Sequence, residues 1–435
     1  MAVFFGTIFN DNIVGTIFND TFIGSSGNDI FNGGSGFDTA DYSNLRNPFS
    51  SRVSVPQSIT ILPTGGISKG SLGTDQLTSV ERIIANPFAS NNLIDASTAA
   101  APSFIDVDLS SSRLTVRNVP FLGTLNFTVN NFDDVSGTNQ NDLIRGDSQS
   151  NRLRGNGGND TFFGTTGNDT LDGGTGNDTA DYRGLGRAIT VRPTGIVEKR
   201  FAGVDDTISM ETIIADPLVG GNTIDSSTAS LGASLSINLS TGAASVFGPF
   251  PTINRTFLNF DDVIGTSGND TIIGDFQANI LNGSSGNDLI RAGGGNDTLV
   301  GGAGNDTLTG ETGATNTFIY NSRFEGVDLI TDFISVDRIH LKSSGFAGLS
   351  RGSLSASRYG EGNSLVAAAS AAFSAGTASN AAILSVGTAA GVDVWYTSNA
   401  LNTALFGTGA NLLATLSSTS TNLATVNQSN FSVIA

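Results

Sequence analysis

The residues of this chain with the clearest chemical potential are aspartates that recur every nine residues. They fall into three blocks, mostly within the pattern Asn-Asp-x-apolar, and glycine precedes most of them. Carboxylates, and the backbone carbonyls that glycine leaves uncovered, are the hard oxygen donors that Ca²⁺ prefers. The repeated aspartates are Asp11, Asp20, Asp29, Asp38, Asp142, Asp160, Asp169, Asp178, Asp270, Asp288, Asp297 and Asp306. One such aspartate would indicate only a turn, but fourteen units in register, with Asn151 and Asn279 in the same frame, favour calcium binding.

Three units carry a specific family signature: GGSGFDTAD (33–41), GGTGNDTAD (173–181) and GGAGNDTLT (301–309). They resemble the haemolysin-type, or RTX, calcium-binding repeat, G-G-x-G-x-D-x-U-x with U apolar. The resemblance covers about 140 residues. It implies an all-β fold, a right-handed parallel β-roll or β-helix solenoid with a C-terminal β cap domain. In that family six residues turn, three form a strand, and two units complete one coil.

The implied coil places every second unit on the same side of the roll. Each Ca²⁺ is then expected between two stacked turns, held by an aspartate from each and by backbone carbonyls. The pairs are Asp11/Asp29, Asp20/Asp38, Asp142/Asp160, Asp160/Asp178, Asn151/Asp169, Asp270/Asp288, Asp288/Asp306 and Asn279/Asp297. About eight Ca²⁺ sites follow. Phe9 and Phe18 replace the fourth-position glycine, and side-chain hydrogen bonds are expected to close the Asn151 and Asn279 turns, so these sites should be the weakest.

The sequence supports a catalytic function less well than it supports calcium binding. The chain has one histidine, His340, and no cysteine, which excludes an HExxH motif, a multi-histidine zinc site, a thiolate site and a disulfide. The carboxylate pairs are Asp133/Asp134, Asp205/Asp206 and Asp261/Asp262. They would suit a polysaccharide-acting enzyme on a β-helix. Two of the pairs occupy equivalent places in a duplicated unit, which favours a structural role, so we expect no enzyme.

A second repeat, of about 130 residues, organises the rest of the chain. GNDIFNGGSGFDTADY (27–42) returns as GNDTLDGGTGNDTADY (167–182), and NFDDVSGT (131–138) returns as NFDDVIGT (259–266). Short alternating runs between the blocks indicate strands. A continuous solenoid with wider turns is the favoured interpretation, and β-sandwich inserts are the alternative.

These repeats predict six segments. They are a first roll block over 1–42, an irregular β-solenoid segment over 43–136, a second roll block over 137–182, a second irregular segment over 183–264, a third roll block over 265–317, and a C-terminal β cap and secretion region over 318–435. The last segment resembles the cap that follows RTX rolls, with Asp328, Ile330, Asp332, Phe333, Asp337, Ile339 and Leu341 in its D-x-I-x-D-F and D-x-I-x-L pattern. The resemblance implies an uncleaved signal for type I secretion machinery. The N-terminus has no basic region and no long apolar run, which is consistent with that route.

The composition of the chain limits the classes of molecule that it is expected to bind. The net charge of −18 and pI near 4.2 exclude nucleic acid and favour divalent cations. No run of 18 apolar residues is present, so no transmembrane segment is expected. The T-A-D-Y and I-D-A-S segments resemble calcium-binding proteins of cyanobacteria and related aquatic bacteria. We expect a secreted structural protein at the cell surface, folded by Ca²⁺.

The apolar segment MAVFFGTIFNDNIVGTIF (1–18) suggests how such a protein would assemble. An open β-prone end is a template for pairing, so we expect head-to-tail association with another copy of the chain into a surface layer or filament. The alternative is a monomeric adhesin or matrix-binding module that takes cell-surface polysaccharide.

Overall fold

The structure of the chain is a computed structural model. It describes residues 1–47, 55–63, 65–248, 251–311, 313–346, 349, 352–353, 359–362, 368, 382–388, 391–397, 410–416, 426 and 428–434. These residues form mainly β-strands, with short 3₁₀ helices η1 (Gly70–Leu72) and η3 (Gln428–Asn430). Within them, no helix has the length and apolar character needed to cross a membrane.

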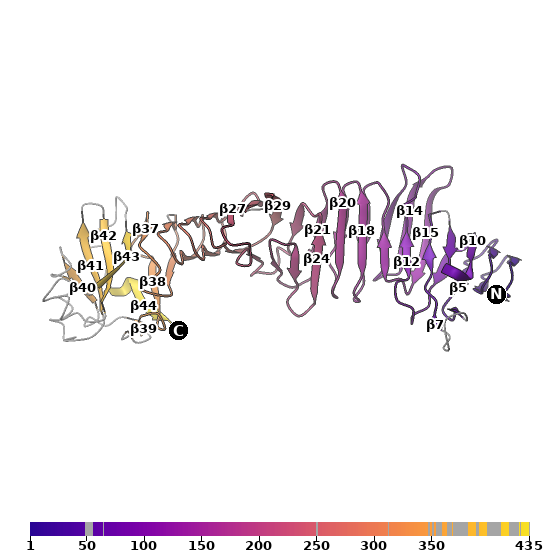
Figure 1. Cartoon of the computed structure of the whole chain (residues 1–435), viewed down its shortest axis with the longest axis horizontal. Coiled ribbons are helices and arrows are strands. Elements are labelled where there is room, and N and C mark those ends of the chain that lie inside the picture. The colour runs from indigo at the N-terminus through magenta and orange to yellow at the C-terminus, as the bar shows by residue number, and fades with distance from the viewer. Residues whose placement is uncertain are drawn as a thin grey trace. The chain divides into compact units, whose positions relative to one another are not determined.

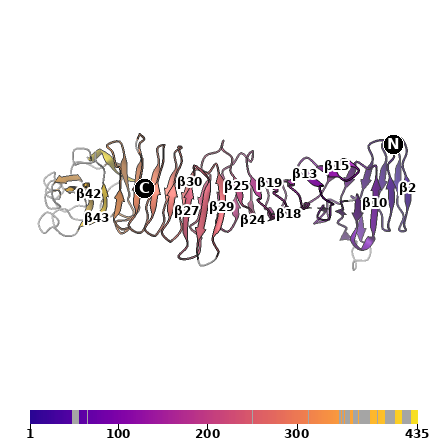
Figure 2. The ribbon, with the colours of Figure 1, turned by 90° about the horizontal axis from the view of Figure 1, so that it is seen from above.

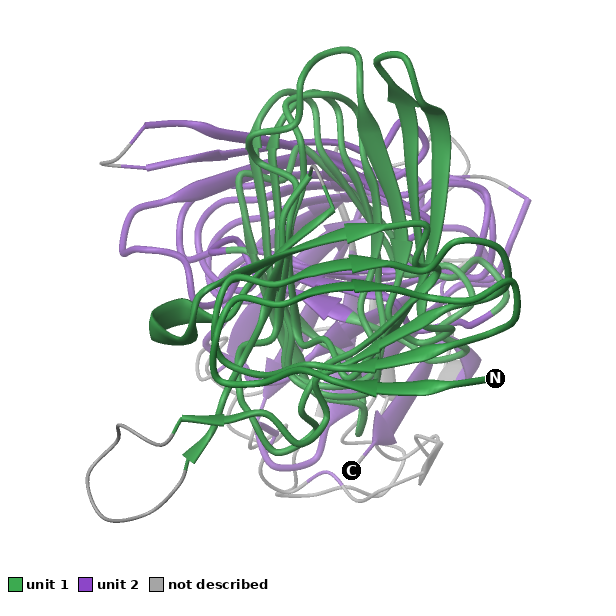
Figure 3. Ribbon diagram, turned by 90° about the vertical axis from the view of Figure 1, so that its right-hand side faces the viewer, with its two compact units in different colours: residues 1–189, 195–218 green, residues 190–194, 219–435 purple. Residues whose placement is uncertain are grey.

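The chain divides into two compact units, coloured separately in Figure 3. Unit 1 comprises Met1–Ile189 and Gly195–Leu218, and unit 2 comprises Thr190–Thr194 and Val219–Ala435. The six-segment division of the sequence stays a prediction. Each unit is described below by itself.

Unit 1 contains the first two roll blocks and the wider coils beside them. Block 1 has β1 (Val3–Phe5), β2 (Asn12–Val14), β3 (Thr21–Ile23), β4 (Ile30–Asn32) and β5 (Thr39–Asp41). The segment after it has β6 (Arg46–Asn47), β7 (Val55–Pro56), β8 (Thr60–Ile61), β9 (Gly66–Ser68), β10 (Thr74–Thr78), β11 (Arg82–Ile84), β12 (Leu93–Asp95), β13 (Phe104–Asp108), β14 (Arg113–Val119), β15 (Gly123–Asn130) and β16 (Asp134–Ser136). Block 2 and its following coil have β17 (Leu143–Arg145), β18 (Arg152–Gly157), β19 (Thr161–Phe163), β20 (Thr170–Thr175), β21 (Thr179–Asp181), β23 (Ile196–Glu198), β24 (Val204–Ile208) and β25 (Thr212–Ile214).

The nine-residue period becomes an eighteen-residue coil. Alternate strands pair in parallel, so that Phe22 of β3 lies beside Ala40 of β5, and Leu153 of β18 lies beside Leu171 of β20. Successive strands therefore belong to opposite faces, and each coil contributes one strand to each face. The strands of consecutive coils follow one another from β18 and β19 to β24 and β25 (Figure 2). This confirms the parallel β-roll that the family resemblance implied.

The core of each roll is one side chain deep from either face. The middle residue of each three-residue strand points inward, and Phe22, Phe31, Ile144, Phe162 and Leu171 are at most 1% exposed. The rings of Phe22 and Phe31 stack with centroids 5.3 Å apart. Two flanking residues point outward, which explains why only one apolar residue is needed in every nine.

The wider segment of unit 1 keeps the coil running while adding hairpins. β11 pairs in parallel with β5, and β12 pairs in parallel with β16. Antiparallel pairing joins β13, β14 and β15, of which β14 and β15 are labelled beside each other in Figure 1. The solenoid therefore continues through this segment, with hairpins inserted into it.

Unit 2 repeats this organisation and ends in the cap. Its strands before the third roll are β22 (Thr190–Val191), β26 (Thr223–Asp225), β27 (Ser234–Asn238), β28 (Ala243–Phe247), β29 (Ile253–Leu258) and β30 (Asp262–Ile264). The third roll has β31 (Thr271–Ile273), β32 (Ile280–Asn282), β33 (Leu289–Arg291), β34 (Thr298–Val300) and β35 (Thr307–Thr309). The cap has β36 (Thr317–Tyr320), β37 (Asp328–Ile330), β38 (Arg338–Lys342), β39 (Gly352–Ser353), β40 (Tyr359–Gly362), β41 (Ala382–Thr388), β42 (Gly391–Thr397), β43 (Ala410–Leu416) and β44 (Phe431–Ile434).

The cap grows directly from the third roll. β36 pairs in parallel with β34, and β37 pairs in parallel with β35. Ile330, Phe333, Ile339 and Leu341 of the predicted cap pattern are buried, at most 1% exposed. The expected C-terminal β cap is therefore confirmed.

Candidate metal centre

The roll places the repeated aspartates inside its turns. Eleven of the twelve are at most 3% exposed: Asp20, Asp29, Asp38, Asp142, Asp160, Asp169, Asp178, Asp270, Asp288, Asp297 and Asp306. Asp11, near the N-terminus, is partly exposed. Carboxylates are rarely buried unless they are paired, so each one requires a partner.

One oxygen of each carboxylate is used to join neighbouring coils. The backbone N–H of Asp142 donates to Oδ1 of Asp160 at 2.8 Å, and that of Asp160 donates to Oδ1 of Asp178 at 2.8 Å. The third roll repeats this, from Asp270 to Asp288 at 2.7 Å and from Asp288 to Asp306 at 2.8 Å. The eighteen-residue spacing thus produces a ladder of aspartates along the roll, and Oδ2 remains to be satisfied.

The second oxygen is buried without a partner in many of these turns. Among the described residues, no hydrogen bond reaches Oδ2 of Asp38, Asp160, Asp178, Asp288, Asp297 or Asp306. A buried carboxylate oxygen without a donor destabilises the fold. A bound cation would remove that cost, so these six positions fit Ca²⁺.

At Asp160 and Asp288, a glycine without a side chain leaves room for the carboxylate oxygen and a backbone carbonyl oxygen to lie close together. A Cβ on Gly155 would lie 2.0 Å from Oδ2 of Asp160 and 2.7 Å from the carbonyl oxygen of Gly173. A Cβ on Gly283 would lie 2.1 Å from Oδ2 of Asp288 and 2.7 Å from the Gly301 carbonyl oxygen. A carboxylate from one coil and a carbonyl from the next therefore converge where only glycine leaves room.

These cradles rely on backbone oxygens. Among the residues that the structure describes, no three histidine, aspartate or glutamate side chains gather around one point. A hard cation that takes six or more oxygen ligands would therefore use carbonyl groups as well as the paired carboxylates. No other side chain needs to converge on the turn.

The pKa values of the buried carboxylates also favour a bound cation at these turns. Burial, followed by the charges of Asp142 and Asp178, raises the pKa of Asp160 to about 7. Burial and the neighbouring Asp270 and Asp306 raise the pKa of Asp288 to about 8. A divalent cation between the turns would favour the ionised carboxylates and displace the protons.

Threonine satisfies the carboxylate at the first turn of each block. The backbone N–H of Thr138 donates to Oδ2 of Asp142 at 2.6 Å, and that of Thr266 donates to Oδ2 of Asp270 at 2.6 Å. In block 1 the first two aspartates, Asp11 and Asp20, receive the same contact from Thr7 and Thr16, each at 2.5 Å. The structure thus separates the predicted ligands into those with a local donor and those without.

The asparagine turns are closed by their own side chains, as the sequence predicted. Nδ2 of Asn151 donates to the carbonyl oxygen of Asp133 at 2.7 Å, and its Oδ1 accepts from the N–H of Asp147 at 2.8 Å. Asn279 repeats the first contact with Asp261, also at 2.7 Å. An uncharged amide thus closes these turns.

Two further turns contain a buried lysine that the sequence analysis missed. Nζ of Lys69 lies 3.1 Å from Oδ2 of Asp29 and also contacts Asp75. Nζ of Lys199 lies 3.3 Å from Oδ2 of Asp169 and also contacts Asp205. The signal was available: KGSLGTD (69–75) and KRFAGVD (199–205) hold lysine six residues before aspartate in both copies.

Glu81 and Glu211 were also missed, and they extend the ladder past the ends of blocks 1 and 2. Oε2 of Glu81 accepts from the N–H of Asp38 at 2.8 Å, and Oε2 of Glu211 accepts from the N–H of Asp178 at 2.8 Å. VERIIA (80–85) and METIIA (210–215) keep this glutamate in both copies. The ladder is therefore longer than the nine-residue pattern.

The candidate catalytic groups take part in backbone contacts. Asp133 and Asp261 accept from the N–H groups of Asn92 and Asn222, each at 2.9 Å. Asp205 contacts Lys199, as described above. Burial and the nearby Arg338 lower the pKa of His340, which lies on β38.

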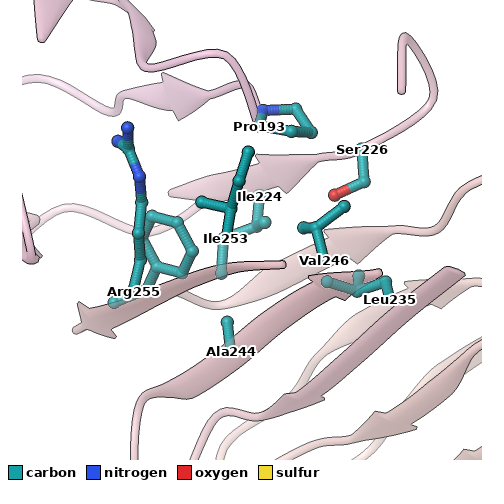
Figure 4. A pocket seen from close by; sticks show the side chains of 9 residues that line it. Pro193, Ile224, Ser226, Leu235, Ala244, Val246, Ile253 and Arg255 are labelled. Carbon is teal, nitrogen blue, oxygen red and sulfur yellow. The ribbon is translucent and has the colours of Figure 1, made fainter. Parts of the chain in front are cut away.

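A small hollow in unit 2 has a different character. It has about 290 Å³ of empty space, partly open to solvent. Apolar side chains of β26 to β29, including Ile224, Val246 and Ile253, line it, with Ser226 and Arg255 beside them (Figure 4). None of the repeated aspartates lines this hollow, so it is separate from the cation cradles.

The fold and the aspartate ladder define a parallel β-roll with calcium-binding turns. The RTX calcium-binding nonapeptide repeat family matches residues 5–40, 129–162, 136–171, 145–180, 259–290 and 282–314. The three roll blocks of the chain therefore contain RTX calcium-binding nonapeptide repeats, as their repeat units indicated.

Among solved structures, the chain is similar to the extracellular lipase LipA from Serratia marcescens. The identity is 15%, the TM-score is 0.24, and the match covers 82% of this chain. The chain spans 45% of that lipase. No curated protein matches the chain.

Proposed function

We propose that this chain is an extracellular structural protein that folds when its rolls bind Ca²⁺ and then assembles head to tail. The observation that carries the first half is the set of six buried carboxylate oxygens without a partner. They make the calcium-free rolls unfavourable, and each ion that binds only the folded state adds to its stability. Calcium-dependent folding also suits export through type I secretion machinery, because the chain would stay unfolded at low cytosolic calcium.

The exposed apolar side chains at the N-terminal end of unit 1 support self-assembly. Eight of the first eighteen residues are apolar side chains at least half exposed: Met1, Val3, Phe5, Ile8, Phe9, Val14, Ile17 and Phe18. β1 and β2 each have a parallel partner, β3 and β4. An apolar patch rimmed by strand edges is suited to another copy of the chain, and a heterologous contact of this kind need not close into a ring.

Sedimentation velocity and electron microscopy in calcium test this assembly. The variant is Phe9→Ser with Phe18→Ser, and the control is Phe276→Ser, at a side chain that is 88% exposed in unit 2. We expect polymers for the wild type and the control, and monomers for the double variant. Monomeric wild type, or polymers unchanged in the double variant, would exclude the N-terminal contact.

A second candidate is a monomeric module that binds matrix polysaccharide. Phe88 and Leu218 occupy equivalent tips in the two copies and are 78% and 93% exposed. Two equivalent exposed tips offer one extended ligand two points of attachment. Retention of monomeric protein on polysaccharide beads, lost in Phe88→Ser with Leu218→Ser, would support this function over assembly.

We propose no enzymatic role for the chain. Turnover of acidic polysaccharide by the purified chain in calcium would refute this proposal.

A further inference from the structure

Lys69 and Lys199 lie where two ladders of unit 1 end. The chain has only three lysines, and these two are both fully buried. Each ammonium group lies between two carboxylates from stacked coils, Asp29 and Asp75 in one case and Asp169 and Asp205 in the other. Burial of a charged lysine is unfavourable unless its ammonium group is paired, so two such residues at equivalent places indicate a defined role.

The two lysine turns have the same construction. The N–H of Lys69 donates to the carbonyl oxygen of Gly73 at 2.8 Å, and that of Lys199 donates to the Gly203 carbonyl oxygen at 2.9 Å. These contacts close the turn that precedes the ladder aspartate. Nζ of Lys199 also donates to the carbonyl oxygen of Thr165 at 2.8 Å. The ammonium group therefore has two carboxylates and a backbone carbonyl around it, the oxygen types that a calcium site would use.

The second carboxylate of each turn is held from its far side. Tyr42 donates its hydroxyl to Oδ2 of Asp75 at 2.7 Å, and Tyr182 donates to Oδ2 of Asp205 at 2.9 Å. Oδ1 of Asp205 accepts from the N–H of Asp169 at 3.0 Å, as in the ladder elsewhere. Both oxygens of the carboxylate thus have donors.

Comparison with the remaining turns shows what the lysines change. Oδ2 of Asp160, Asp178 and Asp288 is buried without a partner among the described residues. Oδ2 of Asp29 and of Asp169 instead contacts an ammonium group, and each also accepts a hydroxyl hydrogen bond, from Ser25 at 3.3 Å and from Thr165 at 3.2 Å. The third roll offers a natural contrast within the chain. There the ladder position after Asp297 is Asn316, whose Oδ1 accepts from the Asp297 N–H at 3.0 Å, and Oδ2 of Asp297 has no partner among the described residues.

We propose that the ammonium groups of Lys69 and Lys199 are built-in cations that take the place of Ca²⁺ at the turns of Asp29 and Asp169. These two turns then bind no metal ion, although the nine-residue pattern assigns them to calcium. They hold the last coils of blocks 1 and 2 together whether or not calcium is present. The inference requires that the other turns bind calcium and is independent of self-assembly.

A map of the bound ions in the wild-type protein tests the proposal directly. Crystals of the full chain grown in calcium should give anomalous difference peaks beside Asp160 and Asp288 and none between Asp169 and Asp205. A peak between Asp169 and Asp205, with Lys199 displaced, would overturn the inference and leave calcium binding intact. Absence of every peak, including those at Asp160 and Asp288, would overturn calcium binding by the rolls as well.

Lysine removal provides a second test. In equilibrium dialysis, Lys69→Ala and Lys199→Ala should each bind one more Ca²⁺ per chain than the wild type, because the two carboxylates are then free to take an ion. The matched control is Lys342→Ala, at the exposed lysine of β38, which should bind the wild-type number. Folded Lys199→Ala, as judged by circular dichroism, with the wild-type number of ions would overturn the proposal. If Lys199→Ala does not fold in millimolar calcium, the wild-type ion map decides.

Discussion

Substitution of Gly283 by alanine tests the proposed cation cradle at a single atom. The added Cβ would lie 2.1 Å from Oδ2 of Asp288 and 2.7 Å from the carbonyl oxygen of Gly301, so the two oxygens must move apart. Gly283 does not adopt a left-handed φ, and the effect therefore arises from the methyl group alone. Overpacking of this kind costs about 1 to 3 kcal/mol, which corresponds to a site weakened roughly 5- to 150-fold.

Calcium titration followed by circular dichroism measures this effect. Gly220→Ala in the same unit is the control, because its Cβ would meet nothing within 4 Å and its φ is likewise outside the left-handed region. We expect the calcium concentration at half-folding to rise for Gly283→Ala and to stay at the wild-type value for Gly220→Ala. Equal titration curves for Gly283→Ala and the wild type would show that the oxygens near Gly283 do not bind the ion.

Three further outcomes follow from other contacts. The raised pKa values of the buried carboxylates, to about 6 for Asp297 and about 8 for Asp288 against an ordinary value of 3.8, mean that the calcium-free fold is most stable below about pH 4 and loses stability as pH rises from about 4 to about 8. Calcium-free melts between about pH 4 and about pH 8 should show the loss, and a pH-stat should record proton release when calcium is added at neutral pH. Tyr182→Phe removes the hydroxyl donor to Asp205 and should lower the stability by about 1.5 to 3 kcal/mol in denaturant melts at saturating calcium, and an unchanged midpoint would contradict the contact. Asn279→Asp removes the amide donor to the Asp261 carbonyl, so its melting temperature should fall most at limiting calcium, and a rise there would refute the closure of that turn.

The sequence determined the repeating part of the fold because that part depends on local spacing. One inward apolar residue per nine, with glycine before each aspartate, is compatible with short strands and tight turns and with few alternatives. The register follows as well, since the contact of Phe22 with Ala40 repeats the eighteen-residue coil. Closure of the Asn151 turn by its own amide was predictable for the same reason, because Asp147 lies only four residues away.

Tertiary structure alone decided which aspartates pair with a buried lysine. Asp169 and Asp178 both stand in Thr-Gly-Asn-Asp-Thr. Oδ2 of the first accepts from Thr165, four residues before it, and from a lysine thirty residues along the chain, whereas Oδ2 of the second has no donor among the described residues. The nine-residue pattern contains no information about that contact, because the wide coil that returns Lys199 to the ladder is set by long-range packing. The aspartate series thus follows from the sequence, whereas its division between metal ions and internal donors depends on which side chains the coils bring together.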